Sequence, residues 1–584
     1  MTFRQIGKLW IRLVVILCVI GLLVNGWLVH ARAQAVSPAE ADNQELLHQQ
    51  ERARVFRQQQ EQSPDVSLQP SVADDSTRLP LDESPCFPID RILLLGDGAE
   101  KFQWALAAAD QAGDGPDGAI GKCLGTSGVN LVMRRVQNAI VNQGYVTTRV
   151  LAEAQDLNSG VLTLTLVPGR IRSIGFAPET NARATLWNAL PAAPGDLLNL
   201  RDVEQALENL KRVPTAEADI RIIPAVGPDA RPGESDLVIL WKQDFPLRLS
   251  LFADDAGARA TGKYQGSTTI SFDHMLTLND LCYVSFNHDL GGDGERQNGT
   301  HGYTAHYSLP LGYWLLGFTT GSNRYRQAVA GATQTYIYSG ESQNSDLKLS
   351  RLVYRDARRK TTLSLGGWQR SSQNFIDDTE VEVQRRRTAG WDFGVAHKEF
   401  IGSATLDLNA GYRRGTGAMN ALPAPEENFN EGTSRFRIIT ADAQLNVPFA
   451  VGGQRLRYTG LVRAQWNHTP LVPQDCFSIG SRYTVRGFDG ENVLSADRGR
   501  LIRNDLGLML GETGQELYLG IDYGEVAGQS SKNLIGTYLS GAVLGLRGGY
   551  KGLTWDLFAG QPLSKPEGFI ADPMVMGFSL NWSF

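Results

Sequence analysis

The chain has 584 residues, which is enough for several domains. Its 56 Lys and Arg residues against 62 Asp and Glu residues give a net charge of −6, which argues against a nucleic-acid-binding protein with a basic surface. Only one segment, at the N-terminus, could cross a bilayer as a helix, so the sequence excludes a membrane protein with several helices. A membrane β-barrel is not excluded, because alternating strands keep the mean hydropathy low, here −0.22.

Residues 1–33 are typical of a secretory signal peptide. Three basic residues, Arg4, Lys8 and Arg12, precede the short apolar run 13–23, and Ala31-Arg32-Ala33 is a small-x-small cleavage pattern. The alternative interpretation is an uncleaved membrane anchor. The polar segment from Ser37 onward favours a mature N-terminus, so we expect the protein to leave the cytoplasm.

Cleavage of the signal peptide would leave four cysteines. Cys86 and Cys123 fall in one predicted domain, and an oxidising compartment would let them form a disulfide. Cys282 and Cys476 lie in unrelated segments, and we expect both to be free.

The next two segments have different compositions. Residues 36–60 are rich in Gln, Glu and Arg and carry a thin apolar stripe, which predicts a polar helix. Residues 61–85 contain four prolines among Ser and Asp, which is typical of a linker. A polar helix on a tether has no core of its own, so we expect it to be solvated or to lie inside a hydrated cavity.

Residues 86–242 predict two small α+β domains with a loosely repeated β-α-α-β-β order. The first has expected strands at 89–95, 146–150 and 161–167 and expected helices at 102–110 and 129–143. The second has expected strands at 171–176, 220–223 and 237–241 and expected helices at 185–190 and 201–211.

From residue 247 to the end, apolar and polar residues alternate in segments of roughly ten residues, as strands of a membrane barrel do. Leu247, Leu249 and Leu251 share one face, whereas Arg248 and Ser250 share the other. We count sixteen segments, an even number, as expected when both barrel termini lie on the periplasmic side. The region predicts a membrane β fold, a sixteen-stranded transmembrane β-barrel.

The alternative for this region is a soluble β-sandwich or jelly roll. The last segment argues against it, because it ends the chain on an apolar edge that water would not favour. In a barrel this edge is paired and its apolar face meets lipid. We therefore interpret the alternating aromatic and aliphatic residues as the C-terminal barrel-assembly signal: Phe578, Leu580, Trp582 and Phe584.

Segments that resemble enzyme motifs lack residues that those motifs require. The glycine-rich segment 115–123 has Pro116 and Cys123 where a phosphate-binding loop needs Gly and Ser or Thr. Lys101 replaces the third glycine of a dinucleotide site. The eight histidines show no metal-ligand spacing. We therefore expect no catalytic residue, no metal and no cofactor.

The most distinctive segment is the longest barrel loop, residues 468–502, between the eleventh and twelfth strands. It contains Val485-Arg486-Gly487-Phe488, and long loops in compact domains are commonly functional. Downstream, the alternation turns Asp522 and Gly524 towards the lumen. An ion pair between Arg486 and Asp522 is one interpretation, and two separate solvated charges are the other; the residues alone leave both open.

The Val485-Arg486-Gly487-Phe488 loop and the Gly520-Ile-Asp522-Tyr-Gly524 strand resemble the two signature motifs of the outer-membrane assembly and secretion superfamily. The second motif often begins with Phe in that family, where this chain has Gly520. Three further segments are similar to the first polypeptide-transport-associated (POTRA) domain of two-partner secretion transporters, and closest to the contact-dependent growth inhibition and haemolysin-export branch: Cys86-Phe-Pro-Ile, Gly121-Lys-Cys123-Leu-Gly and Gln143-Gly-Tyr145-Val-Thr-Thr-Arg149-Val.

The resemblance implies a domain order. Residues 36–60 would be a plug helix, 61–85 a periplasmic linker, 86–168 and 169–242 the two POTRA domains, and 247–584 the outer-membrane barrel. It also favours the Arg486–Asp522 ion pair, which would hold loop 468–502 inside the lumen.

The implied function is export of one large partner exoprotein without ATP, either a contact-dependent growth inhibition toxin or a filamentous haemagglutinin-like protein. The exoprotein would add a strand to a POTRA edge at 171–176, 220–223 or 237–241. Expected further partners are outer-membrane lipid and lipopolysaccharide and, during biogenesis, the barrel assembly machinery; we expect a monomer. A haemolysin secretion and activation transporter is the nearest alternative. An insertase for other barrels would usually carry more than two POTRA domains.

Overall fold

The computed structural model describes residues 38–62, 64–70, 78–112, 115–291, 298–331 and 333–584. The predicted signal peptide and its alternative, a membrane anchor, lie outside the described residues. Among the helices that are described, none has both the length and the apolar character needed to cross a membrane.

The polar helix is α2 (Pro38–Gln60), close to the expected 36–60. Its interior carries no Gly or Pro and is rich in good helix formers, which favours a long regular helix. Side-chain pairs one turn apart support it, with Gln49 donating to Glu45 at 2.9 Å and Arg57 to Glu61 at 3.0 Å.

The first α+β domain is built on the sheet β2-β7-β6 (Arg91–Gly96, Val161–Val167 and Arg149–Leu151). Helix α3 (Thr126–Asn142) buries Val132, Val136 and Ile140 against this domain's core. The segment predicted as a helix over 102–110 is a 3₁₀ helix, η2 (Gln103–Asp110). Short elements complete the domain: β1 Phe87–Pro88, η1 Ala99–Lys101, β3 Gln111–Ala112, β4 Gly115–Pro116, β5 Cys123–Leu124 and η3 Leu157–Ser159.

A disulfide joins Cys86 to Cys123, whose Cα atoms are 5.2 Å apart. It lies beside the β1–β5 pairing and closes the start of this domain onto the strand that precedes α3. Cys282 and Cys476 are free.

The second α+β domain has the sheet order β8-β10-β9 (Arg170–Phe176, Glu234–Gln243 and Ala216–Pro224). Helix α4 (Leu200–Leu210) begins after Asn199, whose side chain accepts from the backbone N–H of Arg201 at 2.9 Å. Two predictions for this domain are wrong. Residues 185–190 form turns, because their polar groups bond to barrel turns instead of to one another. Residues 237–241 were expected to offer a free strand edge to the exoprotein. They lie instead in β10, the central strand of the sheet, whose two edges are both paired.

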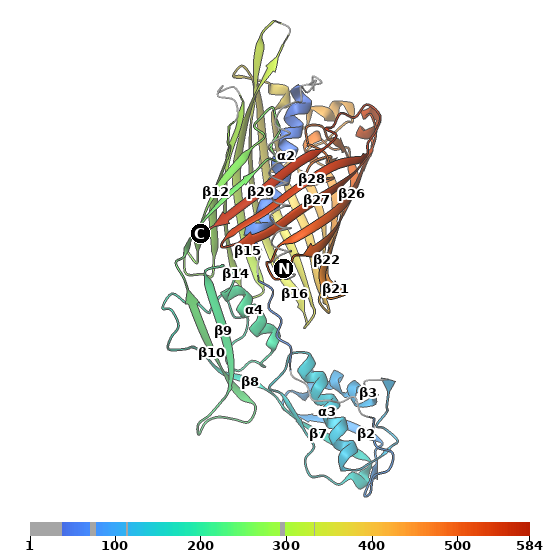
Figure 1. Cartoon of the computed structure of the whole chain (residues 1–584). Helices are drawn as coiled ribbons and strands as arrows, with labels where there is room; N and C mark the ends of the chain where they lie inside the picture. Colours follow the sequence, from blue (N-terminus) through green and yellow to red (C-terminus); the bar gives the residue numbers. More distant parts are fainter. Residues whose placement is uncertain (1–37, 63, 71–77, 113–114, 292–297, 332) are drawn as a thin grey trace, which may run out of the picture. The chain divides into compact units, whose positions relative to one another are not determined.

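The remainder is a closed antiparallel barrel in which β11 pairs with β29, visible in Figure 1 as the junction of green and red strands. The two-residue strand β18 pairs only with β17, so the described chain supplies the sixteen wall strands that were predicted. The strands are β11 Leu247–Asp254, β12 Gln265–Asp273, β13 Leu281–Asp289, β14 Gly299–Leu311, β15 Trp314–Ala330, β16 Thr335–Arg355, β17 Arg359–Ile376, β18 Thr379–Glu380, β19 Arg386–Ile401, β20 Ala404–Thr416, β21 Arg437–Val451, β22 Gln454–Asn467, β25 Arg498–Met509, β26 Glu516–Ala527, β27 Tyr538–Tyr550, β28 Leu553–Ser564 and β29 Val575–Ser583.

Alternation sorts the side chains of each strand between the two faces of the wall. On β26, Leu517, Leu519 and Ile521 are exposed outside, whereas Tyr518 and Asp522 are buried inside. Lipid-facing apolar residues and a polar interior are what a transmembrane barrel requires. Four short 3₁₀ helices lie in the described connections: η4 Glu382–Gln384, η5 Pro425–Phe429, η6 Pro473–Asp475 and η7 Ser530–Asn533.

The long loop between β22 and β25 covers 468–497. We predicted that it extends to 502, but residues 498–502 already belong to β25, where all five pair with β26 and 499–502 also pair with β22. The loop carries a small hairpin, β23 Phe477–Ile479 with β24 Leu494–Ala496. This hairpin packs into an apolar cluster with wall residues such as Leu501, Val526 and Leu539.

Candidate functional site

Arg486, at the centre of the long loop, is buried against two carboxylates of the barrel wall. Its Nε donates to Asp522 Oδ2 at 2.7 Å and its Nη2 to Asp522 Oδ1 at 2.8 Å. The Arg486 backbone N–H also donates to Asp522 Oδ2 at 2.9 Å. The structure thus brings together the two residues that the sequence analysis paired, in a bidentate geometry that fixes both position and orientation.

Asp505 on β25 is the second carboxylate, and the sequence analysis missed it. Its Oδ1 accepts from Arg486 Nη2 at 2.5 Å, and Arg547 Nη1 approaches its Oδ2 at 3.4 Å. The signal for it was available: Ile502 and Leu506 face outward, so Asp505 must face the lumen, directly opposite Gly520 in the β25–β26 register. Because each buried charge has a partner of opposite sign, the cluster avoids the cost of an isolated buried ion.

Glycines in the wall leave the space that the loop occupies. A Cβ at Gly520 would lie 2.7 Å from Arg486 Nη2, which explains why this chain has no aromatic residue there. At Gly541 a Cβ would overlap the Arg486 carbonyl oxygen, and at Gly524 it would lie 2.7 Å from Val485 Cγ2. The wall is therefore shaped to the backbone of the loop as well as to its charge.

The residues on either side of Arg486 are also buried. Val485 and Phe488 belong to the apolar cluster of the loop hairpin, and Phe488 meets Phe569 edge-on with ring centroids 5.8 Å apart. Gly487 adopts a φ of 98°, a left-handed conformation in which a side chain would be strained. The whole Val485–Phe488 motif thus serves to seat the loop in the lumen.

Helix α2 contacts the inside of the barrel mainly through polar groups. Glu51 pairs with Arg463 of β22 at 3.1 Å, and Thr261 donates to Glu45 at 2.7 Å. Arg52 Nη1 donates to Gln265 of β12 at 3.0 Å. His48 is buried next to the long loop, near Gly490.

Between α2 and the Arg486 cluster, a cavity of about 300 Å³ remains, lined by residues of the helix, the loop and the wall such as Phe56, Arg482, Arg503 and Arg547. An extended polypeptide needs a continuous passage, and here the helix and loop occupy the lumen together.

The predicted C-terminal signal lies on the outer face of β29. Leu580, Trp582 and Phe584 are exposed, and Phe578 is half-buried and stacks on Tyr264 with ring centroids 6.3 Å apart. These side chains therefore lie on the lipid-facing surface at the strand that closes the barrel.

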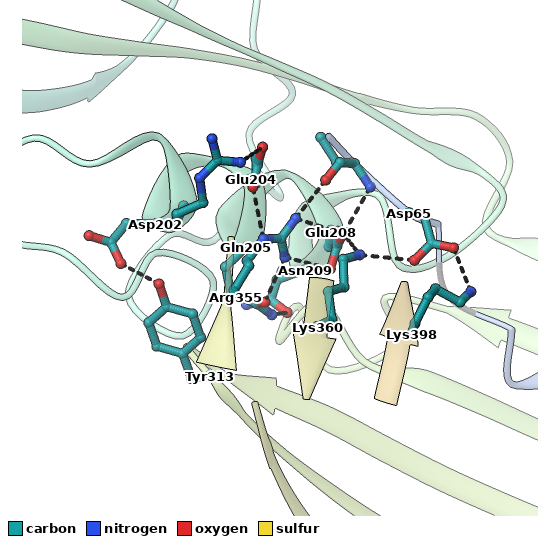
Figure 2. A network of polar contacts seen from close by, with 12 residues as sticks. Asp65, Asp202, Glu204, Gln205, Glu208, Asn209, Tyr313, Arg355, Lys360 and Lys398 are labelled. Carbon is teal, nitrogen blue, oxygen red and sulfur yellow. Dashed lines mark hydrogen bonds and ion pairs between the residues drawn. The ribbon is translucent and has the colours of Figure 1, made fainter. Parts of the chain in front are cut away.

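A second polar cluster lies where α4 meets the ends of barrel strands, shown in Figure 2. Arg355, the last residue of β16, donates to Glu204 Oε2 at 2.8 Å and to both carboxylate oxygens of Glu208, at 2.9 and 3.0 Å. It also donates to the backbone carbonyl of Val66 in the linker at 2.6 Å. One barrel arginine thus holds both α4 and the linker.

The linker is held from both sides in this cluster. Glu208 and Glu204 accept from the backbone N–H groups of Val66 and Leu68, at 2.8 and 2.6 Å. Asp65 accepts from Lys360 at 2.9 Å and Lys398 at 2.7 Å. Partial burial raises the pKa of Asp65, but the hydrogen bonds from the two lysines outweigh it and leave the pKa below its usual range.

A comparison with protein families gives three matches. Residues 233–548 match the model of the haemolysin secretion/activation protein ShlB/FhaC/HecB. Residues 116–169 match the ShlB-type POTRA domain, and residues 170–224 match another POTRA domain model. The two α+β domains are therefore POTRA domains.

Individual relatives are similar over nearly the whole chain. The outer membrane transporter CdiB-2 of Burkholderia pseudomallei (strain 1026b) is 35% identical over 570 residues, 94% of this chain and 96% of that protein. The hemolysin transporter protein HpmB of Proteus mirabilis is 22% identical over 490 residues, 83% of this chain and 82% of that protein. A solved structure of CdiB from Acinetobacter baumannii superimposes with a TM-score of 0.80 at 30% identity, covering 94% of this chain and 100% of that one.

Proposed function

The chain belongs to the ShlB/FhaC/HecB family of haemolysin secretion/activation proteins, and we propose that it exports a toxin of the contact-dependent growth inhibition type. It is an outer-membrane transporter of two-partner secretion, with its barrel in the outer membrane and its POTRA domains in the periplasm. A haemolysin is the second candidate cargo, since a hemolysin transporter is also among the relatives.

The choice of cargo is supported by the CdiB relatives, whereas the way in which the pore opens is inferred from the occupied lumen. Loop 468–497 is held by the buried Arg486 ion pairs, and α2 is held by polar contacts that include the partly exposed pair Glu51–Arg463. We infer that this is a resting state and that transport begins when α2 leaves the lumen. The loop stays seated on the wall and forms one side of the opened passage.

The exported chain would first bind a POTRA strand edge. Strands β8 and β9 are the outer strands of the second POTRA sheet, and within the described residues β9 pairs with β10 alone, over all nine of its residues. An unfolded chain can add to such an edge through main-chain hydrogen bonds, which tolerate many sequences. Folding of the cargo outside the cell would supply the free energy, since no nucleotide is available in the periplasm.

The α4 cluster would connect cargo binding to plug release. Helix α4 belongs to the same POTRA domain as the cargo-binding edge, and its Glu204 and Glu208 hold the linker that follows α2 (Figure 2). A shift of α4 on cargo binding would loosen the linker, and α2 would then lose its tether.

Single-channel conductance in planar bilayers tests the plug and the pore together. We expect the full-length protein to show small, flickering openings and a variant lacking residues 38–60 to show large, steady ones. Equal large pores from both proteins would contradict a plugging role for α2. Absence of conductance from both would contradict the pore itself and favour an insertase.

A further inference from the structure

Four large apolar side chains are exposed at the end of the barrel that adjoins the second POTRA domain. Trp187 is 69% exposed and Phe245 is 75% exposed, and Met275 and Leu276 are each more than half exposed. Trp187 lies in the POTRA segment 177–199, Phe245 in the connection to β11, and the other two at the tip of the β12–β13 turn. Water disfavours such a group of side chains, so its surroundings need an explanation.

The segment that carries Trp187 is bound firmly to barrel turns. Arg183 Nη2 donates to the His274 carbonyl at 2.6 Å, and Thr185 Oγ1 donates to the Thr277 carbonyl at 2.5 Å. The Asn188 side chain donates to the Leu278 carbonyl at 2.5 Å. These bonds fix the backbone on both sides of Trp187 at the β12–β13 turn.

A second turn holds the same segment. The backbone N–H of Gly312, between β14 and β15, donates to the Asn188 carbonyl at 2.7 Å. Asn188 itself is buried, and Leu186 packs against the POTRA core. The indole of Trp187 therefore projects from a rigid backbone, and its exposure is set by the packing of its neighbours.

These side chains continue the lipid-facing surface of the barrel. Phe245 is in phase with Leu247 and Leu249, which are exposed on the outer face of β11. Trp314, next to the β14–β15 turn, is exposed on the outer face of β15. The exposed apolar surface thus extends from the wall, over the turns, onto the POTRA segment.

We propose that Trp187, together with Phe245, Met275 and Leu276, inserts into the headgroup region of the periplasmic phospholipid leaflet and anchors the second POTRA domain there. Trp is favoured at this depth because its ring is apolar and its N–H can bond to water or headgroups. The anchor fixes the height of strand edges β8 and β9 above the membrane. Because the proposed anchor is a contact with lipid, its test does not depend on the identity of the cargo.

Difference fluorescence in lipid bilayers tests this contact. Full-length protein and its Trp187→Phe variant are reconstituted in phosphatidylcholine, and subtraction of their spectra isolates the emission of Trp187. We expect phosphatidylcholine brominated near the headgroup end of its acyl chains to quench this emission strongly, and bromination deeper in the chains to quench it less.

The matched control is Trp104→Phe, because Trp104 is also partly exposed but lies on η2 of the first POTRA domain. We expect its difference emission to be unquenched by brominated lipid and to be quenched by the aqueous quencher acrylamide. The proposal is overturned if brominated lipid leaves the Trp187 emission unquenched and acrylamide quenches it, as expected for Trp104. It is also overturned if Trp187 is protected from acrylamide only after exoprotein is added. Trp187→Tyr provides a second subtraction if the Phe variant does not assemble.

Discussion

The long loop and helix α2 both lie in the lumen, but they are held there by different kinds of contact. The loop combines an apolar cluster with Arg486, whose guanidinium is bound by two buried carboxylates. Helix α2 has one buried polar contact, Glu45 with Thr261, but its ion pair with the wall, Glu51–Arg463, keeps some exposure to water on both side chains. Buried charge pairs are costly to break, whereas partly solvated ones contribute little.

This difference indicates which of the two segments can leave. The loop matches glycine-lined space in the wall and behaves as part of the barrel. The helix exchanges protein contacts for water contacts at small cost, so it can be displaced while the wall stays intact. The following predictions test this contrast.

The largest effect is expected for Arg486→Ala, which removes the nearest cation from both buried carboxylates and leaves only the longer contacts of Asp505 with Arg547 at 3.4 Å and of Asp522 with Arg503 at 3.8 Å. Breaking a buried pair in this way costs about 3–5 kcal/mol. We expect the barrel to assemble, judged by its heat-modifiable gel mobility, but secretion of the partner exoprotein to be lost. The control is Arg500→Ala, which removes an exposed pair with Glu525 on the neighbouring strand. Normal secretion by the Arg486 variant would refute the role of this residue.

Gly541→Ala tests the shape of the loop seat without changing charge. The added Cβ overlaps the Arg486 carbonyl oxygen, so the loop must shift away from β27. We expect faster cleavage of the loop by trypsin in the assembled barrel. Gly367→Ala on β17 is the matched control, since a Cβ there meets no other atom within 4 Å. Equal cleavage rates in the two variants would argue against a tightly seated loop.

Arg355→Ala removes the residue that joins α4 to the linker. Hydrogen bonds to charged groups contribute about 1.5–3 kcal/mol each, but Glu204 keeps Arg201 and Glu208 keeps Lys360 as partners. We expect more frequent large openings in planar bilayers, because the tether of α2 is loosened. Arg351→Ala, which removes a cation–π contact with Trp314, should leave the openings unchanged. Equal frequencies of large openings in the two variants would contradict the proposed coupling between α4 and α2.

Arg463→Ala should act directly on the plug and more weakly. The Glu51–Arg463 pair is partly solvated, so its loss is expected to cost about 1 kcal/mol, or roughly a fivefold rise in open probability. Arg324→Ala, in an exposed pair with Glu341, is the control. An effect as large as that of Arg486→Ala would remove the contrast between helix and loop.

The smallest effect concerns pH. The pKa of Asp65 lies below its ordinary value of 3.8, so its contribution to linker docking is fully present above that value. It is lost as the pH falls through the lowered pKa. We expect channel flicker to be unchanged between pH 7 and pH 5 and to increase only below about pH 4. We expect channels of the Asp65→Asn variant to flicker more than wild type already at pH 7. Equal flicker of variant and wild type both at pH 7 and below pH 4 would contradict the docking role.

Local sequence patterns were sufficient for much of the fold. Alternation over each strand predicted the sixteen wall strands, because in a barrel the two-residue period decides which face meets lipid. The same period placed Tyr518 and Asp522 inside the lumen. The helical period predicted α3 and α4, since one apolar face of each packs on a sheet.

Local patterns failed where the partners lie far away in the chain. Residues 185–190 looked helical, but their hydrogen-bond acceptors come from barrel turns about ninety residues later. The order of strands placed β10 in the centre of its sheet, which the composition of the strand does not reveal.

The sequence by itself therefore determined the class of each segment and the direction in which its side chains point, because both depend on periodicity within a few residues. Only the tertiary structure decided which groups meet. It added Asp505 to the Arg486 pair, set Gly541 against the loop backbone, and joined Arg355 to both α4 and the linker. These contacts join separate strands and loops, and their geometry is fixed only when the barrel closes.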